Sequence, residues 1–208
     1  MKTPLVIATG NAHKVQEFVN LLESSFDVED LHSVRKSWRM PEETGKSFAE
    51  NARIKALALA SVCGEYVLAD DSGLEVDALG GAPGIYSARF AGENAGDAEN
   101  RAKLLAALAG VPVEERSARF WCALCLVKGA SVVLECDGVC EGRILDGEQG
   151  AGGFGYDPLF VPTGHEESFA QMGQTEKDLL SHRGRATLLL VEQWTRLQNE
   201  NGGGRPNE

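Results

Sequence analysis

The spacing of hydrophobic and polar residues changes along the chain in a way that indicates alternating strands and helices. Residues 4–9 form a short apolar run, which is typical of a buried strand and stops at Gly10-Asn11. Over residues 12–23 the apolar side chains recur every three or four positions, as in an amphipathic helix. Asn11 is placed to be the N-cap of that helix. The N-terminal pattern therefore predicts a strand, a tight turn and a helix.

The same alternation continues to the end of the chain. Further strands are expected over residues 26–31, 66–70, 117–127 and 131–136, and further helices over 47–62, 97–108 and 175–197. We expect strand 66–70 to be broken at Ser72-Gly73, and residues 34–45 to form a polar connection. The apolar side of the last helix is expected to consist of Leu188, Leu189, Val191 and Trp194. The turn Lys128-Gly129-Ala130 joins two neighbouring strands as a hairpin, so the sheet is not purely parallel.

These elements predict an α/β fold with a mixed, partly antiparallel central sheet flanked by helices, in two lobes around a cleft. Residues 1–198 are expected to form a single two-lobed domain. The tail 199–208 has no packing residues and is predicted to be disordered.

Charge and composition narrow the possible partners. The 208 residues carry 20 Lys plus Arg against 31 Asp plus Glu, a net charge of −11, which argues against nucleic acid as a partner. No apolar run approaches the roughly 20 residues of a membrane helix, and the first residues lack a signal-peptide pattern, so we expect a cytoplasmic protein without membrane contact. An acidic chain that binds an anion needs a local basic site or a divalent cation.

The cysteines raise the question of a zinc site. Cys122-x2-Cys125 and Cys136-x3-Cys140 have a spacing that resembles zinc ligands. In a strand, however, residues three apart point to opposite faces of the sheet. We therefore favour small buried side chains over structural zinc.

A phosphate-binding loop is one candidate for chemistry. A strand that turns at glycine into a helix directs backbone N–H groups and the positive end of the helix dipole at a phosphate. The residues of this loop are Thr9, Gly10, Asn11, Ala12, His13 and Lys14. A Walker A motif is absent, and an ordinary turn with a surface lysine explains the motif alone equally well.

An acidic turn is the second candidate. Asp70 and Asp71 are expected at the end of a buried strand, where α/β proteins usually place their sites. Carboxylates there, joined by Glu42 and Glu43 from the preceding loop, suit Mg²⁺. The alternative is a plain polar turn. Asn51 and Lys55 lie four apart and so share one face of the predicted helix over 47–62.

The glycine-rich segment 150–155 matches GxGxxG, the dinucleotide-binding fingerprint. Tyr156-Asp157-Pro158 follows where that fingerprint would need a helix, so a Rossmann site is excluded. A loop with Phe154 and Tyr156 can instead fold over a flat base, because glycines allow close backbone approach. A flexible surface loop is the alternative.

Basic residues near the C-terminus supply positive charge. Lys177, Ser181 and His182 are expected near one helical face, followed by Arg183. Arginine and histidine can donate hydrogen bonds to an oxo group or a phosphate. A Ser181–His182–Asp178 triad is excluded because adjacent helical residues diverge. Solvated charges at a helix end remain the alternative.

Taken in order, these segments resemble a known family. TGNAHK, EETG, FAENARIKA, ADDSGLEVDALGGAPGIYSARF, GGFGYDPLF and SHRGRA are similar to the non-canonical purine NTP pyrophosphatases, also called inosine triphosphate pyrophosphatases. The resemblance runs from about residue 5 to about residue 190. It implies Mg²⁺-dependent hydrolysis of ITP, dITP or XTP to the monophosphate and pyrophosphate, in a homodimer whose subunits hold the nucleotide in a cleft between two lobes.

The resemblance also assigns roles to residues. Asp71 would be the general base, and Glu43, Asp70 and Asp71 would hold the metal. The substrate contacts it implies are Thr9 to Lys14, Lys55, Ser72, Phe154, Gly155, Tyr156, Asp157, Lys177, His182 and Arg183. Two rival hypotheses remain at this point: a Maf-like pyrophosphatase that acts on other bases, and a nucleotide-sensing module without catalysis.

Overall fold

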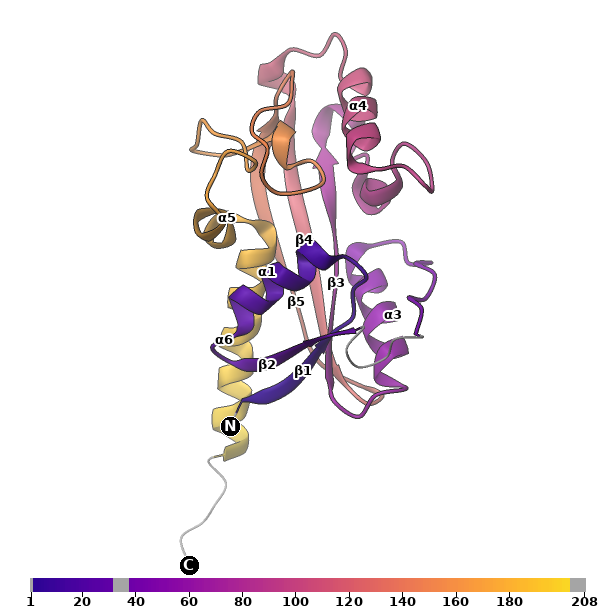
Figure 1. Ribbon diagram of the computed structural model, residues 1–208, viewed down its shortest axis with the longest axis vertical. Helices are drawn as coiled ribbons and strands as arrows, with labels where there is room; N and C mark the ends of the chain where they lie inside the picture. The colour runs from indigo at the N-terminus through magenta and orange to yellow at the C-terminus, as the bar shows by residue number, and fades with distance from the viewer. Residues whose placement is uncertain (1, 32–37, 203–208) are drawn as a thin grey trace, which may run out of the picture.

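The computed structural model describes residues 2–31 and 38–202. Its centre is a six-stranded mixed sheet with strand order β2-β1-β3-β4-β5-β6 (Figure 1). The strands are Thr3–Ile7 (β1), Phe26–Asp30 (β2), Tyr66–Val76 (β3), Ser117–Lys128 (β4), Ser131–Ile144 (β5) and Phe160–Pro162 (β6). β1 pairs in parallel with β2 and β3, and the remaining pairs are antiparallel. This confirms the predicted α/β class with a mixed sheet.

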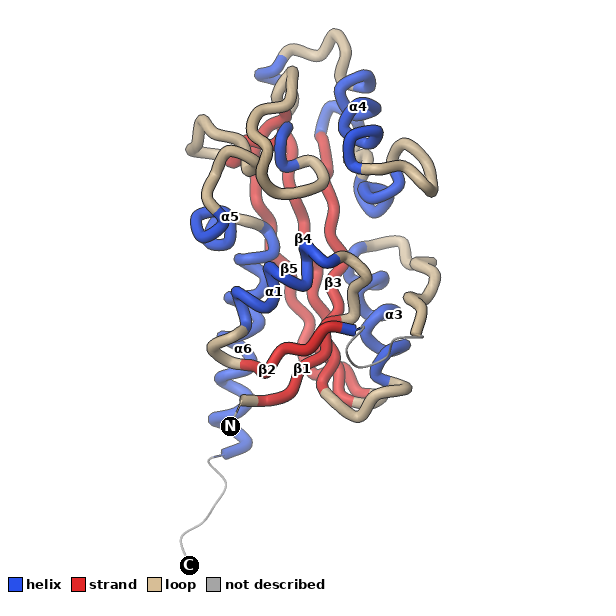
Figure 2. Tube along the Cα trace, in the orientation of Figure 1, coloured by secondary structure: helices blue, strands red, loops and turns tan. Residues whose placement is uncertain are grey.

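Helices lie against both faces of the sheet and at its upper end (Figure 2). The α-helices are Ala12–Leu22 (α1), Phe48–Ala60 (α3), Asp97–Ala107 (α4), Gln174–Leu180 (α5) and His182–Gly202 (α6). Short 3₁₀ helices cover Asp77–Leu79 (η1), Gly84–Arg89 (η2), Val113–Glu115 (η3) and Asp157–Leu159 (η4). Asn11 caps α1 and Ser47 caps α3, as predicted. No helix in residues 2–31 and 38–202 is long and apolar enough to cross a membrane.

Three buried clusters hold these layers together. α1 and α6 pack on one face of the sheet through side chains such as Phe18 and Leu190, and α3 packs on the other through Ala52 and Leu59. A third cluster joins α4 to the far ends of β3, β4 and β5. These three long strands run through both halves of the molecule in Figure 1, so the halves share one continuous sheet.

The expected break in β3 is wrong. The strand continues through Ser72 and Gly73 to Val76, pairing with β4 along its whole length. Gly73 is required by packing rather than by a turn, because a Cβ there would lie 2.5 Å from the Gly84 carbonyl oxygen and 2.9 Å from a ring carbon of Phe48. Asp70 therefore lies in the middle of β3, just beyond the last residue that pairs with β1.

The single helix expected over 175–197 is also wrong. The helix ends before Ser181, whose backbone is extended. The Ser181 hydroxyl group caps α6 by accepting the Gly184 N–H at 3.0 Å. Lys177 and His182 consequently sit on two different helices. The predicted apolar side is wrong at Leu188 and Leu189, which are exposed, while Leu190 and Trp194 are buried.

The C-terminal tail is ordered further than predicted. α6 runs to Gly202, so the residues from 199 to 202 are helical, and 203–208 lie outside the described residues. Of the expected connection over 34–45, the part before residue 38 is likewise outside the described residues, and 38–45 forms neither helix nor strand.

Candidate active site

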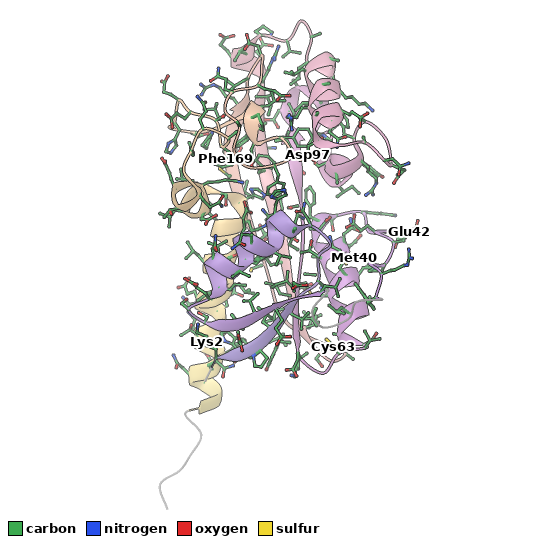
Figure 3. The ribbon with its side chains drawn as sticks, in the orientation of Figure 1. Lys2, Met40, Glu42, Cys63, Asp97 and Phe169 are labelled. Carbon is green, nitrogen blue, oxygen red and sulfur yellow. The ribbon has the colours of Figure 1, made fainter. Side chains whose placement is uncertain are left out.

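Two adjoining hollows open beside the C-terminal end of β1. The charged hollow is lined by Thr9, Gly10, Asn11, Lys14, Met40, Pro41, Glu42, Glu43, Lys55, Asp71, Ser72, Ile85, Ala88, Arg89 and Glu93. The aromatic hollow is lined by Asn11, Lys14, Ser72, Gly73, Ser87, Ala88, Asp97, Asn100, Phe120, Phe154, Gly155, Tyr156, Asp157, Lys177, His182 and Arg183. Four residues line both, so one elongated ligand can occupy the two hollows together. In Figure 3, Met40 and Glu42 lie beside α3, and Asp97, the first residue of α4, lies above them.

The loop from Thr9 to Lys14 forms the rim between the hollows. The Asn11 carboxamide oxygen accepts the N–H groups of His13 at 2.9 Å and of Lys14 at 3.3 Å. The backbone N–H groups of His13 and Lys14, which were expected to be free to bind a phosphate, are therefore already bonded. The positive end of α1 and the Lys14 ammonium group remain as the electrostatic attraction for an anion.

Asp70 faces the side of the sheet covered by α1 and α6. Its Oδ2 lies 2.8 Å from Lys14 Nζ and 3.2 Å from an Arg183 guanidinium nitrogen, and it accepts the Ser72 hydroxyl at 3.2 Å. Burial opposes ionisation of this carboxyl, but Lys14 and Arg183 outweigh it and hold the pKa of Asp70 well below its usual range. Asp70 is therefore an ionised counter-charge for the partly buried Lys14 and the buried Arg183.

Asp71 faces the opposite side, towards α3. Its Oδ1 accepts from Lys55 Nζ at 2.9 Å and its Oδ2 from the Asn51 amide at 3.1 Å. Lys55 Nζ also donates to Glu43 at 2.8 Å. Burial raises the pKa of Asp71, Lys55 opposes the rise, and the charge of Glu43 adds to it. A carboxylate with a raised pKa is the form that a general base takes near neutral pH.

The structure brings together only part of the expected metal set. Asp71 and Glu43 share Lys55 and line the charged hollow, whereas Asp70 lies on the other side of β3. Among the described residues no group of three or more His, Cys, Asp or Glu side chains could hold a metal by itself. Two carboxylates that face a polyphosphate-sized hollow still fit Mg²⁺, which commonly takes one or two protein carboxylates and completes its shell with phosphate oxygens and water.

A second buried ion network supports the aromatic hollow. Glu17, on α1, accepts from Lys177 Nζ at 2.8 Å and from an Arg183 guanidinium nitrogen at 2.5 Å. Lys177 also donates to Asp157 at 2.7 Å. Burial opposes ionisation of Glu17, but Arg183 and Lys177 outweigh it and lower its pKa. The network ties α1, α5, α6 and the glycine-rich loop to one another.

The glycine-rich loop wraps around Asp157 and presents Phe154. The Phe154 N–H donates to Asp157 at 2.9 Å, and the Phe154 ring stacks on His13 with centroids 5.3 Å apart. Two residues of α4 bind both backbone groups of Gly155. Asp97 accepts the Gly155 N–H at 2.7 Å, and Arg101 donates to the Gly155 carbonyl at 2.9 Å. The aromatic ring is thus kept at the wall of the hollow.

Tyr156 lines the aromatic hollow, but its hydroxyl group already has a hydrogen-bond partner within the protein. Its hydroxyl group donates to the Ser87 carbonyl at 2.8 Å, which joins the loop to η2.

His182 stacks on Phe120, with ring centroids 4.7 Å apart and planes 11° from parallel. Burial and the neighbouring Arg183 and Lys177 lower the pKa of His182 well below its ordinary value, so the ring is neutral. Its Nδ1 is buried and has no hydrogen-bond partner among the described residues. His182 and Phe120 both line the aromatic hollow, so their stacked rings form part of its wall.

Several residues that lie at or next to the site were not among the expected site residues: Glu17, Asn51, Arg89, Asp97, Arg101 and Phe120. A signal was available for Glu17, which lies three residues after Lys14 and next to Phe18 on the inner face of α1. For Asn51, the helical spacing to Lys55 pointed at a shared partner, which is Asp71. Phe120 and Arg101 come from distant strands and helices, and nothing in their local sequence indicates the site.

The cysteines form no metal site. Cys122 belongs to the cluster under α1 and α6 and Cys125 to the cluster under α3, so the two thiols lie on opposite faces of β4, as predicted. The five cysteines are free, and burial raises the pKa of Cys125 and Cys136 to about 12.

Comparisons with known proteins identify the family of this chain. The Ham1 family model matches residues 5–193. The dITP/XTP pyrophosphatase of Desulforamulus reducens is 47% identical over 194 residues, covering 93% of this chain and 96% of the relative. That of Pseudomonas syringae pv. tomato is 50% identical over 190 residues, covering 90% and 95%. A HAM1 protein structure from Coxiella burnetii has a TM-score of 0.83 at 40% identity, covering 93% of this chain and 99% of that one. The chain belongs to the Ham1 family.

Proposed function

We propose that this protein hydrolyses the purine nucleoside triphosphates ITP, dITP and XTP to the nucleoside monophosphate and pyrophosphate, and so cleanses the nucleotide pool. The observation that carries the proposal is the continuity of the two hollows across Asn11, Lys14 and Ser72. A base fits the aromatic hollow and a triphosphate the charged one. The relatives named dITP/XTP pyrophosphatases support the same substrate class.

The reaction follows from the placement of Asp71. This carboxylate lines the charged hollow, so it can accept a proton from a water molecule that attacks the α-phosphorus. The bond from that phosphorus to the bridging oxygen breaks, and pyrophosphate leaves with the electron pair. Lys14 and Lys55 stabilise the negative charge that develops on the phosphates.

We propose Mg²⁺ as the cofactor, held by Glu43 and Asp71 together with phosphate oxygens. When bound, the ion would neutralise polyphosphate charge and make the α-phosphorus more electrophilic. Asp70, which the resemblance assigned to the metal, instead orients Lys14 and Arg183 in this structure.

Base selection follows from donors and acceptors in the aromatic hollow. Hypoxanthine and xanthine present a 6-oxo acceptor, where adenine presents an amino donor. Arg183 is engaged by Glu17, Asp70 and Ser72, so His182, which also lines the aromatic hollow, is the better candidate for the hydrogen-bond donor to this oxo group. A mismatch of this kind can discriminate by ~10⁴ or more.

We also propose that the protein is a cytoplasmic homodimer. Both properties are carried over from the resemblance to the inosine triphosphate pyrophosphatases. Sedimentation equilibrium of the purified chain tests the dimer, because a species of twice the 22.3 kDa chain mass is expected.

A substrate panel tests the proposed activity. Pyrophosphate release is measured for ITP, dITP, XTP, GTP and ATP, with Mg²⁺ and with EDTA. We expect release from the first three only, and only with Mg²⁺. Preference for pyrimidine or methylated nucleotides would favour a Maf-like activity, and binding of ITP without turnover would favour a sensing module.

A further inference from the structure

Asn51 is a fully buried polar residue next to the site, and it lines neither hollow. Its side chain is 0% exposed. Buried amides are normally retained only where both ends are bonded. Here the amide nitrogen donates to Asp71 Oδ2 at 3.1 Å, and the carboxamide oxygen accepts the Gly45 N–H at 2.8 Å.

One end of Asn51 fixes the orientation of Asp71. Asn51 and Lys55 lie one turn apart on α3, and each donates to a different oxygen of the same carboxylate. The terminal torsion of an aspartate is soft, so two donors from one rigid helix determine which oxygen faces the charged hollow. Lys55 lines that hollow and can also contact a ligand, whereas Asn51 can act only through Asp71.

The other end of Asn51 fixes the segment that carries Glu43. Gly45, two residues after Glu43, packs so closely that a Cβ there would lie 2.6 Å from the Asn51 oxygen and 2.8 Å from Glu50 Cβ. The loop is thus seated directly on the first turn of α3. Through this bond the same side chain sets the positions of Asp71 and Glu43, the two carboxylates of the charged hollow that share Lys55.

We propose that Asn51 is a positioning residue, which holds Asp71 and the Glu43 segment in their working arrangement. The inference rests on the proposed hydrolysis of ITP. Because Asn51 touches neither hollow, its loss is expected to slow the chemical step and to leave nucleotide binding nearly unchanged. A displacement of about 1 Å at a reacting group can cost up to about 10²-fold in rate.

The test compares two substitutions. Asn51→Leu keeps the approximate shape and removes both hydrogen bonds, and Asn51→Asp keeps the acceptor for Gly45 but replaces the donor to Asp71 by a second carboxylate. Arg53→Gln supplies the control, because Arg53 lies on the same helix as Asn51, lines neither hollow and loses only an exposed ion pair with Glu135. This variant is expected to keep the kcat and KM of the wild type.

Steady-state turnover of ITP, IMP affinity by calorimetry and thermal unfolding are measured for each variant. We expect both Asn51 variants to lose about 10- to 100-fold in kcat, with KM and IMP affinity within about 3-fold of wild type. In an Asp71→Asn background, Asn51→Leu is expected to cause a clearly smaller fold-loss of kcat than in the wild type, because only the part of its effect that acts through the Glu43 segment remains.

Three results would overturn the inference: an unchanged kcat, the same fold-loss in the Asp71→Asn background, or an equal loss of kcat in the Arg53→Gln control. If Asn51→Leu does not fold, Asn51→Asp decides by its kcat and IMP affinity. A wild-type protein that releases no pyrophosphate from ITP would overturn the proposed function and this inference with it. An active wild type with unaffected Asn51 variants would overturn the inference alone.

Discussion

Asp70 and Asp71 are consecutive residues of β3, yet their carboxylates serve opposite sides of the sheet. Asp70 pairs with Lys14 and Arg183 under α1 and α6, and Asp71 with Lys55 and Asn51 under α3. The period of two in a strand separates neighbours in this way. One aspartate therefore organises cations, and the other is left to face the charged hollow.

Replacing each aspartate by asparagine is expected to separate stability from catalysis. Asp70→Asn removes the carboxylate that pairs with Lys14 and one of the two that pair with the buried Arg183, so the free energy of unfolding should fall by up to about 3–5 kcal/mol. Asp71→Asn should lower kcat by about 10²- to 10⁴-fold with little loss of stability, because Lys55 keeps its contact with Glu43. Urea unfolding and turnover of ITP measure the two effects. A folded Asp71→Asn protein that keeps a substantial part of wild-type kcat would remove Asp71 as the base.

The order of strands and helices was predictable because each carries a local periodic pattern, as residues 12–23 do. The break at Ser181 was not predicted, although its signals are local: Ser181 accepts the N–H of Gly184, and a Cβ at Gly184 would collide with the Asp178 carbonyl oxygen. Gly73 was misinterpreted because the atoms packed against it come from Gly84, Ser87 and Phe48, which its local sequence does not indicate. The residues of the site were mostly identified by resemblance, whereas the division between Asp70 and Asp71 needed the strand to continue.

His182 should control the choice between oxo and amino bases. His182→Phe preserves an aromatic ring to stack on Phe120 but removes both ring nitrogens. We expect the ratio of kcat/KM for ITP over ATP to fall by about 10-fold or more. Arg183→Ala is a poor test of selectivity, because it also removes one of the two cations that pair with each of the buried carboxylates Glu17 and Asp70. An unchanged ratio in the His182 variant would mean that another group reads the base.

The hydrogen bonds from Asp97 and Arg101 of α4 to Gly155 of the glycine-rich loop should affect nucleotide binding more than turnover. Arg101→Gln loses the bond to the Gly155 carbonyl and the ion pair with Glu148. Loss of a charged hydrogen bond is expected to raise KM for ITP by about 10-fold with kcat nearly constant. Arg53→Gln, which loses only an exposed pair with Glu135, is the control. Equal KM values for the two variants would show that the bond between Arg101 and Gly155 does not support nucleotide binding.

Glu17 should make the stability of the fold sensitive to acid. Its pKa in the folded protein is lowered from 4.5, so its stabilising contribution is complete above that value and is lost as the pH falls through the lower folded pKa. Glu17→Gln is expected to cost about 3 kcal/mol near neutral pH. The difference from wild type in urea unfolding should shrink progressively below pH 4.5. A difference that is constant with pH would show that Glu17 does not act as an ionised partner of Lys177 and Arg183.

Hydrolysis of ITP in ¹⁸O-labelled water, with mass analysis of both products, tests the central claim most directly. Attack at the α-phosphorus by a water molecule bound at Asp71 predicts one labelled oxygen in IMP and none in pyrophosphate. Label in pyrophosphate, or products that are IDP and inorganic phosphate, would contradict this account of the site.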